Sequence, residues 1–164
     1  MVVVAIVGVL AAVGVTLFRK YIFSSKTVEA VSVIQAIRAA QERHRAETQQ
    51  YFDASPEKKW YPNETPGKTV REWRFPGHPE WVYWQRLNVA YTQPVQFGYI
   101  VNAGLPGTAY AQLVTQNSNP GWPSSAPEPW YVIQAKADAD VDGAFAYFVA
   151  SSLNAEIYSE NEGE

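Results

Sequence analysis

Three aspartates at alternate positions, Asp138, Asp140 and Asp142, are followed directly by Gly143. This D-x-D-x-D-G pattern is the first half of an EF-hand loop, in which alternate carboxylates bind Ca²⁺ and the glycine allows a tight turn. The twelfth position of such a loop should be a bidentate glutamate, but it is Val149 here. Two interpretations follow: a hairpin turn with positive φ near its glycine, which the strand-like flanks favour, and a turn that binds Ca²⁺.

No catalytic constellation stands out in the rest of the sequence. The two histidines, His44 and His78, lack the i, i+4 spacing or glutamate partner of a metalloenzyme, and the chain has no cysteine. Nucleophile-elbow, Walker and dinucleotide-binding motifs do not occur. We therefore do not expect an enzyme. The net charge of −3, with 13 basic residues spread thinly, makes no nucleic-acid binding evident.

Aromatic residues make up 14% of the chain, with six Trp and ten Tyr. Such side chains could stack on carbohydrate or on a partner protein, because their faces give a large contact area at low entropy cost. The alternative is a small core that aromatic rings hold together in place of disulfides. The sequence favours this second interpretation.

The first 18 residues form an uncharged run in which Thr16 is the only polar side chain before Arg19 and Lys20. As a helix this run would be about 27 Å long, close to the thickness of a bilayer core. We expect such a helix to insert in a membrane or to be buried against copies of itself. Because no charged segment precedes the run and no clean cleavage pattern follows it, we expect an internal segment of a longer precursor rather than a secretory signal or signal anchor. The expected assembly core consists of Val2, Val3, Val4, Ile6, Val7, Val9, Leu10, Val13, Val15, Leu17 and Phe18.

A periodic apolar pattern then continues without Pro or Gly as far as Asp53. It predicts one helix from about residue 2 to residue 52, about 75 Å long and longer than a domain of this mass is wide. We therefore divide the chain into a projecting apolar half-helix, residues 1–24, and a globular head, residues 25–164, which includes the amphipathic half 25–52. The amphipathic stripe is predicted to consist of Val28, Val31, Ile34, Ile37 and Ala40.

The composition changes after Asp53, beyond which all six Trp and all 11 Pro lie. Alternating side chains predict a strand from Val95 to Val101, and two further strand-like runs cover Trp130–Ala137 and residues 144–152. Residues 80–88 are predicted to form a short helix or strand. The stretches 54–80 and 117–129 are expected to be loops, because Pro and Gly interrupt them repeatedly.

The first third of the chain resembles the N-terminal helix of type IV pilins and of the related pseudopilins of type II secretion. The resemblance rests on MVVVAIVGVLAAVG, on the segment Phe18-Arg19-Lys20-Tyr21 and on SKTVEAVSVIQAIRAAQERHRAETQQYFD. It implies an α+β fold in which a long N-terminal helix, the pilin-like spine, packs on a C-terminal antiparallel sheet. The N-methylated Phe of the family and its following Glu do not occur in this sequence, and Thr16 stands where the family often has a helix-breaking Pro.

The same resemblance implies a structural role. We expect a subunit that polymerises into a type IV pilus-like extracellular filament through its apolar N-terminal helix, with the head on the outer surface and with a task such as adhesion or motility. The implied partners are copies of the chain, prepilin peptidase, the pilus assembly machinery and the inner membrane, which the precursor occupies before the filament reaches the bacterial cell surface. The alternatives are a membrane-anchored binding domain that does not polymerise and a pseudopilin of a type II secretion system. Apart from Ca²⁺ at the Asp138–Gly143 turn, no cofactor is expected.

Overall fold

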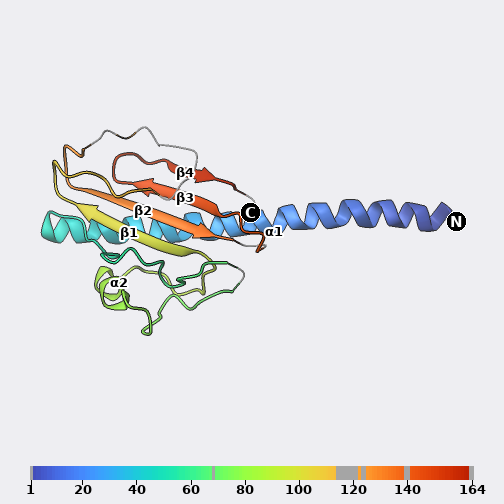
Figure 1. The fold of residues 1–164 in the computed structure, drawn as a ribbon, viewed down its shortest axis with the longest axis horizontal. Helices are drawn as coiled ribbons and strands as arrows, with labels where there is room; N and C mark the ends of the chain where they lie inside the picture. The colour runs from blue at the N-terminus through green and yellow to red at the C-terminus, as the bar shows by residue number, and fades with distance from the viewer. Residues whose placement is uncertain (1, 68, 114–121, 123–124, 139–140, 163–164) are drawn as a thin grey trace.

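A computed structural model of the chain describes residues 2–67, 69–113, 122, 125–138 and 141–162, with the side chains of residue 5 and residues 15–25 outside the description. Figure 1 shows the sheet lying along one half of the long helix, while the other half of that helix projects from the head. The elements are α1 (Val2–Thr48), α2 (Trp81–Leu87), β1 (Gly98–Gly104), β2 (Trp130–Ala137), β3 (Ala146–Ser151) and β4 (Ile157–Glu160).

The helical stretch that packs on the sheet does not lie at the N-terminus, and this corrects the predicted fold class. Residues 26–48 carry the side chains that lie against the sheet, whereas the described side chains of residues 2–14 are all exposed. The prediction of a long N-terminal helix, a pilin-like spine, packed on a C-terminal antiparallel sheet is therefore wrong. The physical reason is that residues 2–14 are apolar on every side and have no single face that a sheet could cover.

The stripe of α1 that contacts the sheet follows true helical spacing, three and four residues apart. The predicted stripe at strict three-residue steps is partly wrong, because Val28 is 65% exposed and Val31 is only half-buried. Each three-residue step turns about 300° around the helix axis, so successive steps drift away from one face by about 60°. The positions that are buried are Ala30, Val33, Ile34, Ile37 and Ala40.

The sheet is an antiparallel meander in the order β1-β2-β3-β4. The bounds of β2 are as predicted, and β3 lies within the predicted range 144–152. β1 begins at Gly98 rather than at Val95, because Val95 pairs with Arg71 of the preceding loop in an isolated bridge. The sequence analysis did not predict β4. The segment predicted as a short helix or strand over residues 80–88 is the helix α2.

The two faces of the sheet have different cover. Side chains alternate between the faces along each strand, so Ile133 and Phe148 lie in the large buried cluster that includes the stripe of α1. Val132 and Val149 point the other way and belong to a second, smaller cluster under the segment that carries Tyr110. The sheet therefore has one apolar face against the helix and one face that this second cluster covers only in part.

Two arginines of α1 hold segments that are distant in sequence. Arg38 donates to the main-chain carbonyls of Ala155 at 2.7 Å and Glu156 at 2.9 Å, just before β4. Arg43 donates to the carbonyl of Asn88 at 2.6 Å, where α2 ends. Charge-assisted hydrogen bonds of this kind are stronger than neutral ones. They fix α1 relative to both β4 and α2.

Gln41 makes the corresponding contact to the segment that leaves α1. Its side chain is completely buried, its Nε2 donates to the Phe52 carbonyl at 2.7 Å, and its Oε1 accepts from the Phe52 N–H at 2.9 Å. The main-chain N–H and carbonyl of one residue, Phe52, are thus paired by a single side chain. Removal of that side chain would leave two main-chain groups without partners.

We predict that Gln41→Ala lowers the free energy of unfolding by about 2–3 kcal/mol, because it leaves the Phe52 N–H and carbonyl unpaired. Urea denaturation of the full chain in a neutral detergent, followed by Trp fluorescence, measures the change. The control is Gln35→Ala on the exposed side of the same helix, which should change the free energy by no more than about 0.5 kcal/mol. Equal effects of the two substitutions would contradict the assigned role of Gln41.

Candidate functional site

The most unusual surface of the molecule is the N-terminal stretch of α1. Its large apolar side chains are all exposed, from 52% for Val13 to 74% for Val4. Three further members of the predicted assembly core, Val15, Leu17 and Phe18, lie outside the described side chains. The exposed members are Val2, Val3, Val4, Ile6, Val7, Val9, Leu10 and Val13.

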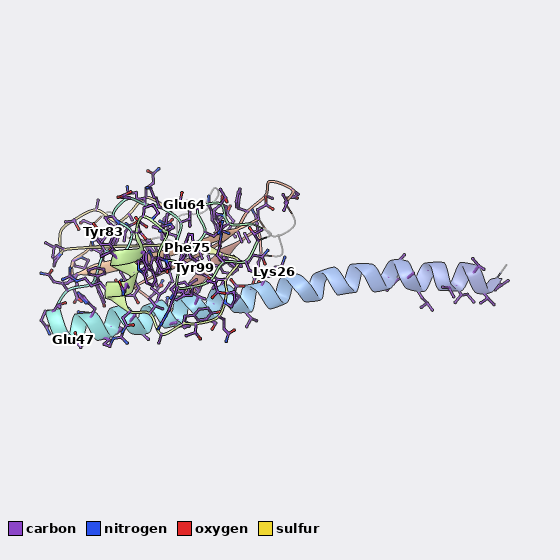
Figure 2. All side chains as sticks on the ribbon, turned by 90° about the horizontal axis from the view of Figure 1, so that it is seen from below. Lys26, Glu47, Glu64, Phe75, Tyr83 and Tyr99 are labelled. Atoms are coloured by element: carbon purple, nitrogen blue, oxygen red, sulfur yellow. The ribbon has the colours of Figure 1, made fainter. Side chains whose placement is uncertain are left out.

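This stretch, residues 2–14, projects from the head and carries no charged residue. Figure 2 shows the side chains of the head crowded around one half of α1, with the helix continuing beyond Lys26 away from them. Contiguous apolar surface on a folded protein typically marks a contact with another protein or with lipid. None of the helices in the described residues is both long enough and apolar enough to cross a membrane. Chemically, the stretch can do one thing, which is to be buried against another apolar surface.

A half-buried carboxylate anchors α1 at the start of the sheet. Glu29 Oε1 accepts hydrogen bonds from the main-chain N–H groups of Gln96 at 2.8 Å and Phe97 at 3.3 Å, just before β1. Burial raises the pKa of Glu29 above its ordinary value, and the two N–H groups and the charge of Lys26 offset part of this rise. Sequence reasoning did not single out Glu29, because its partners lie 67 and 68 residues away along the chain.

The aspartate motif forms the connection between β2 and β3. Asp138 is 8% exposed, its Oδ1 accepts from the Val141 N–H at 2.7 Å, and its Oδ2 accepts from the Gly143 N–H at 3.1 Å. Asp142 is exposed and accepts from the Ala144 N–H at 2.7 Å, while Asp140 lies outside the described residues.

The φ of Gly143 is 94°, in the region that favours glycine, as the hairpin interpretation predicted. Among the described residues, no group of three or more acidic or histidine side chains is placed to hold a metal ion. Both oxygens of Asp138 instead bind the turn itself. The Ca²⁺ interpretation stays a prediction that these contacts do not support.

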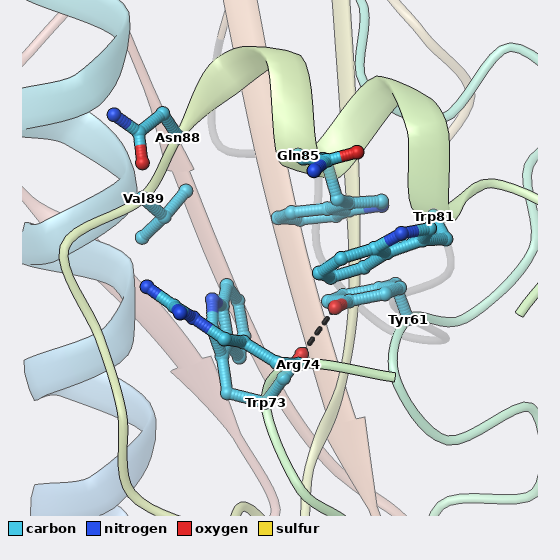
Figure 3. A pocket seen from close by; sticks show the side chains of 8 residues that line it. Tyr61, Trp73, Arg74, Trp81, Gln85, Asn88 and Val89 are labelled. Carbon is cyan, nitrogen blue, oxygen red and sulfur yellow. Dashed lines mark hydrogen bonds between the residues drawn. The ribbon is translucent and has the colours of Figure 1, made fainter. Parts of the chain in front are cut away.

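The aromatic side chains near α2 contact one another. The ring of Tyr61 stacks on Trp84 with centroids 4.7 Å apart and meets Trp73 edge-on at 5.3 Å. Its hydroxyl donates to the Trp73 carbonyl, and burial raises the pKa of Tyr61 to about 12. Figure 3 shows the rings of Tyr61 and Trp73 beside a cavity of about 210 Å³, which Trp84 and Arg74 also line. The buried, mutually stacked rings support the interpretation of an aromatic core at this place.

No protein-family model, curated protein or solved structure matches the chain. The resemblance to type IV pilins therefore stays a prediction that rests on residues of the N-terminal third.

The raised pKa of Glu29 predicts a specific dependence of stability on pH. Between pH 4.5, the ordinary pKa of a glutamate, and the raised pKa of Glu29, the folded chain binds more protons than the unfolded chain. The contribution of Glu29 to the free energy of unfolding therefore falls as the pH rises through this window. Gln at this position keeps an acceptor oxygen for the two N–H groups but does not titrate. The free energy of unfolding of Glu29→Gln should therefore rise relative to that of the wild type from pH 4 to pH 7.

Urea denaturation of the full chain in a neutral detergent at pH 4, 5.5 and 7 tests this. Gln35→Ala, at an exposed position of the same helix, removes no titratable group; it is the control and should differ from the wild type in the free energy of unfolding by an amount that pH leaves nearly unchanged. If the difference between Glu29→Gln and the wild type also stays constant with pH, the account of this carboxylate is wrong.

Proposed function

We propose that this chain is a structural subunit that polymerises into a type IV pilus-like extracellular filament through the exposed apolar side chains of residues 2–14. The single observation that supports the proposal most is that eight large apolar side chains are exposed together on one uncharged, projecting stretch of helix. Their burial against copies of the same stretch would contribute about 25 cal/mol for each Å² of apolar surface removed from water.

The contacts between α1 and the head supply the second requirement of a filament, a constant geometry. Four side chains hold the helix to the segment before β1, to the segment before β4, to the chain after α1 and to the end of α2: Glu29, Arg38, Gln41 and Arg43, in that order. A helix fixed in this way projects from every copy in the same direction. Repetition of one head-to-tail contact between such copies gives an open helical assembly unless the rotation closes a ring.

On this proposal the heads lie on the outside of the filament and the apolar stretches lie in its core. The inner membrane holds the subunit before assembly, and prepilin peptidase and a pilus assembly machinery process it. These partners and the final location at the cell surface belong to the proposal, because they follow from the resemblance of the N-terminal third. The filament core itself can be tested with the chain alone.

Two valines of α1 offer a matched test. Val9 and Val28 are 66% and 65% exposed, but only Val9 lies in the projecting stretch. We predict that Val9→Asp abolishes assembly, because a carboxylate without a partner would have to be buried in the core. After removal of detergent, the fraction of protein that sediments as polymer should fall at least tenfold in this variant.

Val28→Asp is the control and should leave the sedimenting fraction close to that of the wild type. Trp fluorescence in detergent reports whether the head is folded in both variants, since all six Trp lie beyond Asp53. Two results would count against the proposal: normal assembly of Val9→Asp, and a loss in Val28→Asp as large as that in Val9→Asp.

A further inference from the structure

The sheet face that points away from α1 carries a polar region beside the second apolar cluster. Asn102 of β1, Gln134 and Lys136 of β2 and Tyr147 of β3 lie on this face, because their neighbours along each strand belong to the cluster on the α1 side. Lys136 is directly opposite Tyr147 in the register of β2 and β3. Polar side chains from three adjacent strands therefore meet on one face.

These side chains line a cavity of about 460 Å³, which Lys58 and Trp60 border from the loop that follows α1. Its volume falls within the range of about 300–1,000 Å³ that is usual for small-molecule sites. It is larger than the cavity beside the aromatic cluster near α2. The lining is mixed, with amide, ammonium and aromatic groups together.

The charge of the cavity is positive. Its described lining includes two ammonium groups, Lys58 and Lys136, and no carboxylate. Lys136 is half-buried, and its Nζ lies 4.6 Å from the ring centroid of Trp60 and 4.8 Å from that of Phe145. Burial lowers the pKa of Lys136 below its ordinary value, so its charge is held in a place where water stabilises it poorly.

Carboxylates do lie in the surroundings. Glu64 and Asp138 border a neighbouring cavity that Lys136 also lines, and the charge of Lys58 acts on Asp53. Among the described residues, however, no carboxylate lies within ion-pair distance of Lys136. Electrostatically, an anionic group in the cavity would supply the counter-charge that the described part of the chain does not place beside this lysine.

Two buried amides give the cavity fixed hydrogen-bonding groups. Asn102 is 6% exposed, and its Nδ2 donates to the Ser55 carbonyl at 2.9 Å and to Asp53 Oδ1 at 3.2 Å. Gln134 is 2% exposed, and its Nε2 donates to the Gln112 carbonyl at 3.2 Å. Because these bonds hold the nitrogen of Asn102, its Oδ1 has a fixed position and accepts no hydrogen bond from the described residues.

From this arrangement we infer that the cavity is a binding site for an acidic saccharide, a sugar unit that carries a carboxylate. The two ammonium groups recognise the carboxylate, Oδ1 of Asn102 accepts from a ring hydroxyl, and the rings of Trp60 and Tyr147 contact the apolar edge of the sugar. This inference is independent of polymerisation, since the cavity lies on the head and not on residues 2–14.

The test is calorimetric titration of the full chain in a polyoxyethylene detergent, which has no sugar headgroup, with tetragalacturonate as the probe. Fully methyl-esterified tetragalacturonate, which keeps the rings and loses the charges, is the matched ligand control. We expect the acid to bind and the ester to bind at least tenfold more weakly. Lys136→Gln and Lys58→Gln should each weaken binding of the acid at least tenfold.

Lys59→Gln is the matched protein control, because Lys59 neighbours Lys58 but pairs with Glu57 at 2.9 Å and does not line the cavity. It should leave the affinity unchanged. Lys58 is exposed, so Lys58→Gln decides the question if Lys136→Gln does not fold. No binding of the acid, equal binding of the ester, an equal loss in Lys59→Gln, or an affinity for inorganic sulfate as high as for the acid would each overturn the inference.

Discussion

The structure depends on the burial of one stripe of α1 against one face of the sheet. Ala30, Val33, Ile34, Ile37 and Ala40 form a stripe that belongs to the large buried cluster together with side chains of β1, β2 and β3. Each such side chain contributes up to about 1.5–3 kcal/mol when it is fully buried, less for the alanines. β1, β2 and β3 receive these side chains on one apolar face, because alternate residues of each strand point to the same side. The polar contacts of Glu29, Arg38, Gln41 and Arg43 surround this stripe and fix its register.

Once this stripe is buried, two surfaces of opposite chemistry are left. Residues 2–14 extend past the sheet, and their large apolar side chains are exposed. The far face of the sheet is covered by the smaller apolar cluster only in part, and its remaining part is polar and positively charged. The two surfaces lie on different parts of the molecule. Assembly through the first would therefore leave the second accessible on the head.

The local elements were largely predictable from the sequence, whereas their arrangement was not. The bounds of β2 and the hairpin near Gly143 follow from alternation and from turn chemistry. β4 escaped prediction because it has only four residues, of which only Glu160 is fully buried. The prediction of a pilin-like spine was wrong because the apolar pattern of residues 2–14 indicates that these side chains become buried but does not indicate against which surface.

Among the candidate site residues, too, those with a local sequence pattern were predictable and those that depend on distant contacts were not. The exposed apolar stretch was predicted from composition alone, because an uncharged run of that length is rare in a soluble domain. Glu29 and Lys136 could not be found in that way, because each contacts groups that are distant in sequence. Glu29 binds the N–H groups of Gln96 and Phe97. Lys136 lies over the ring of Trp60. A charged side chain carries no local signal that it will be buried.

The central claim is that other copies of this chain bury residues 2–14. Electron cryo-microscopy of the full-length protein, after the detergent is diluted below its critical micelle concentration, tests the claim most directly. The account predicts helically ordered filaments in which residues 2–14 of neighbouring copies pack together along the axis and the heads face outward. Single particles that stay monodisperse, or ordered assemblies in which residues 2–14 remain on the surface, would contradict it.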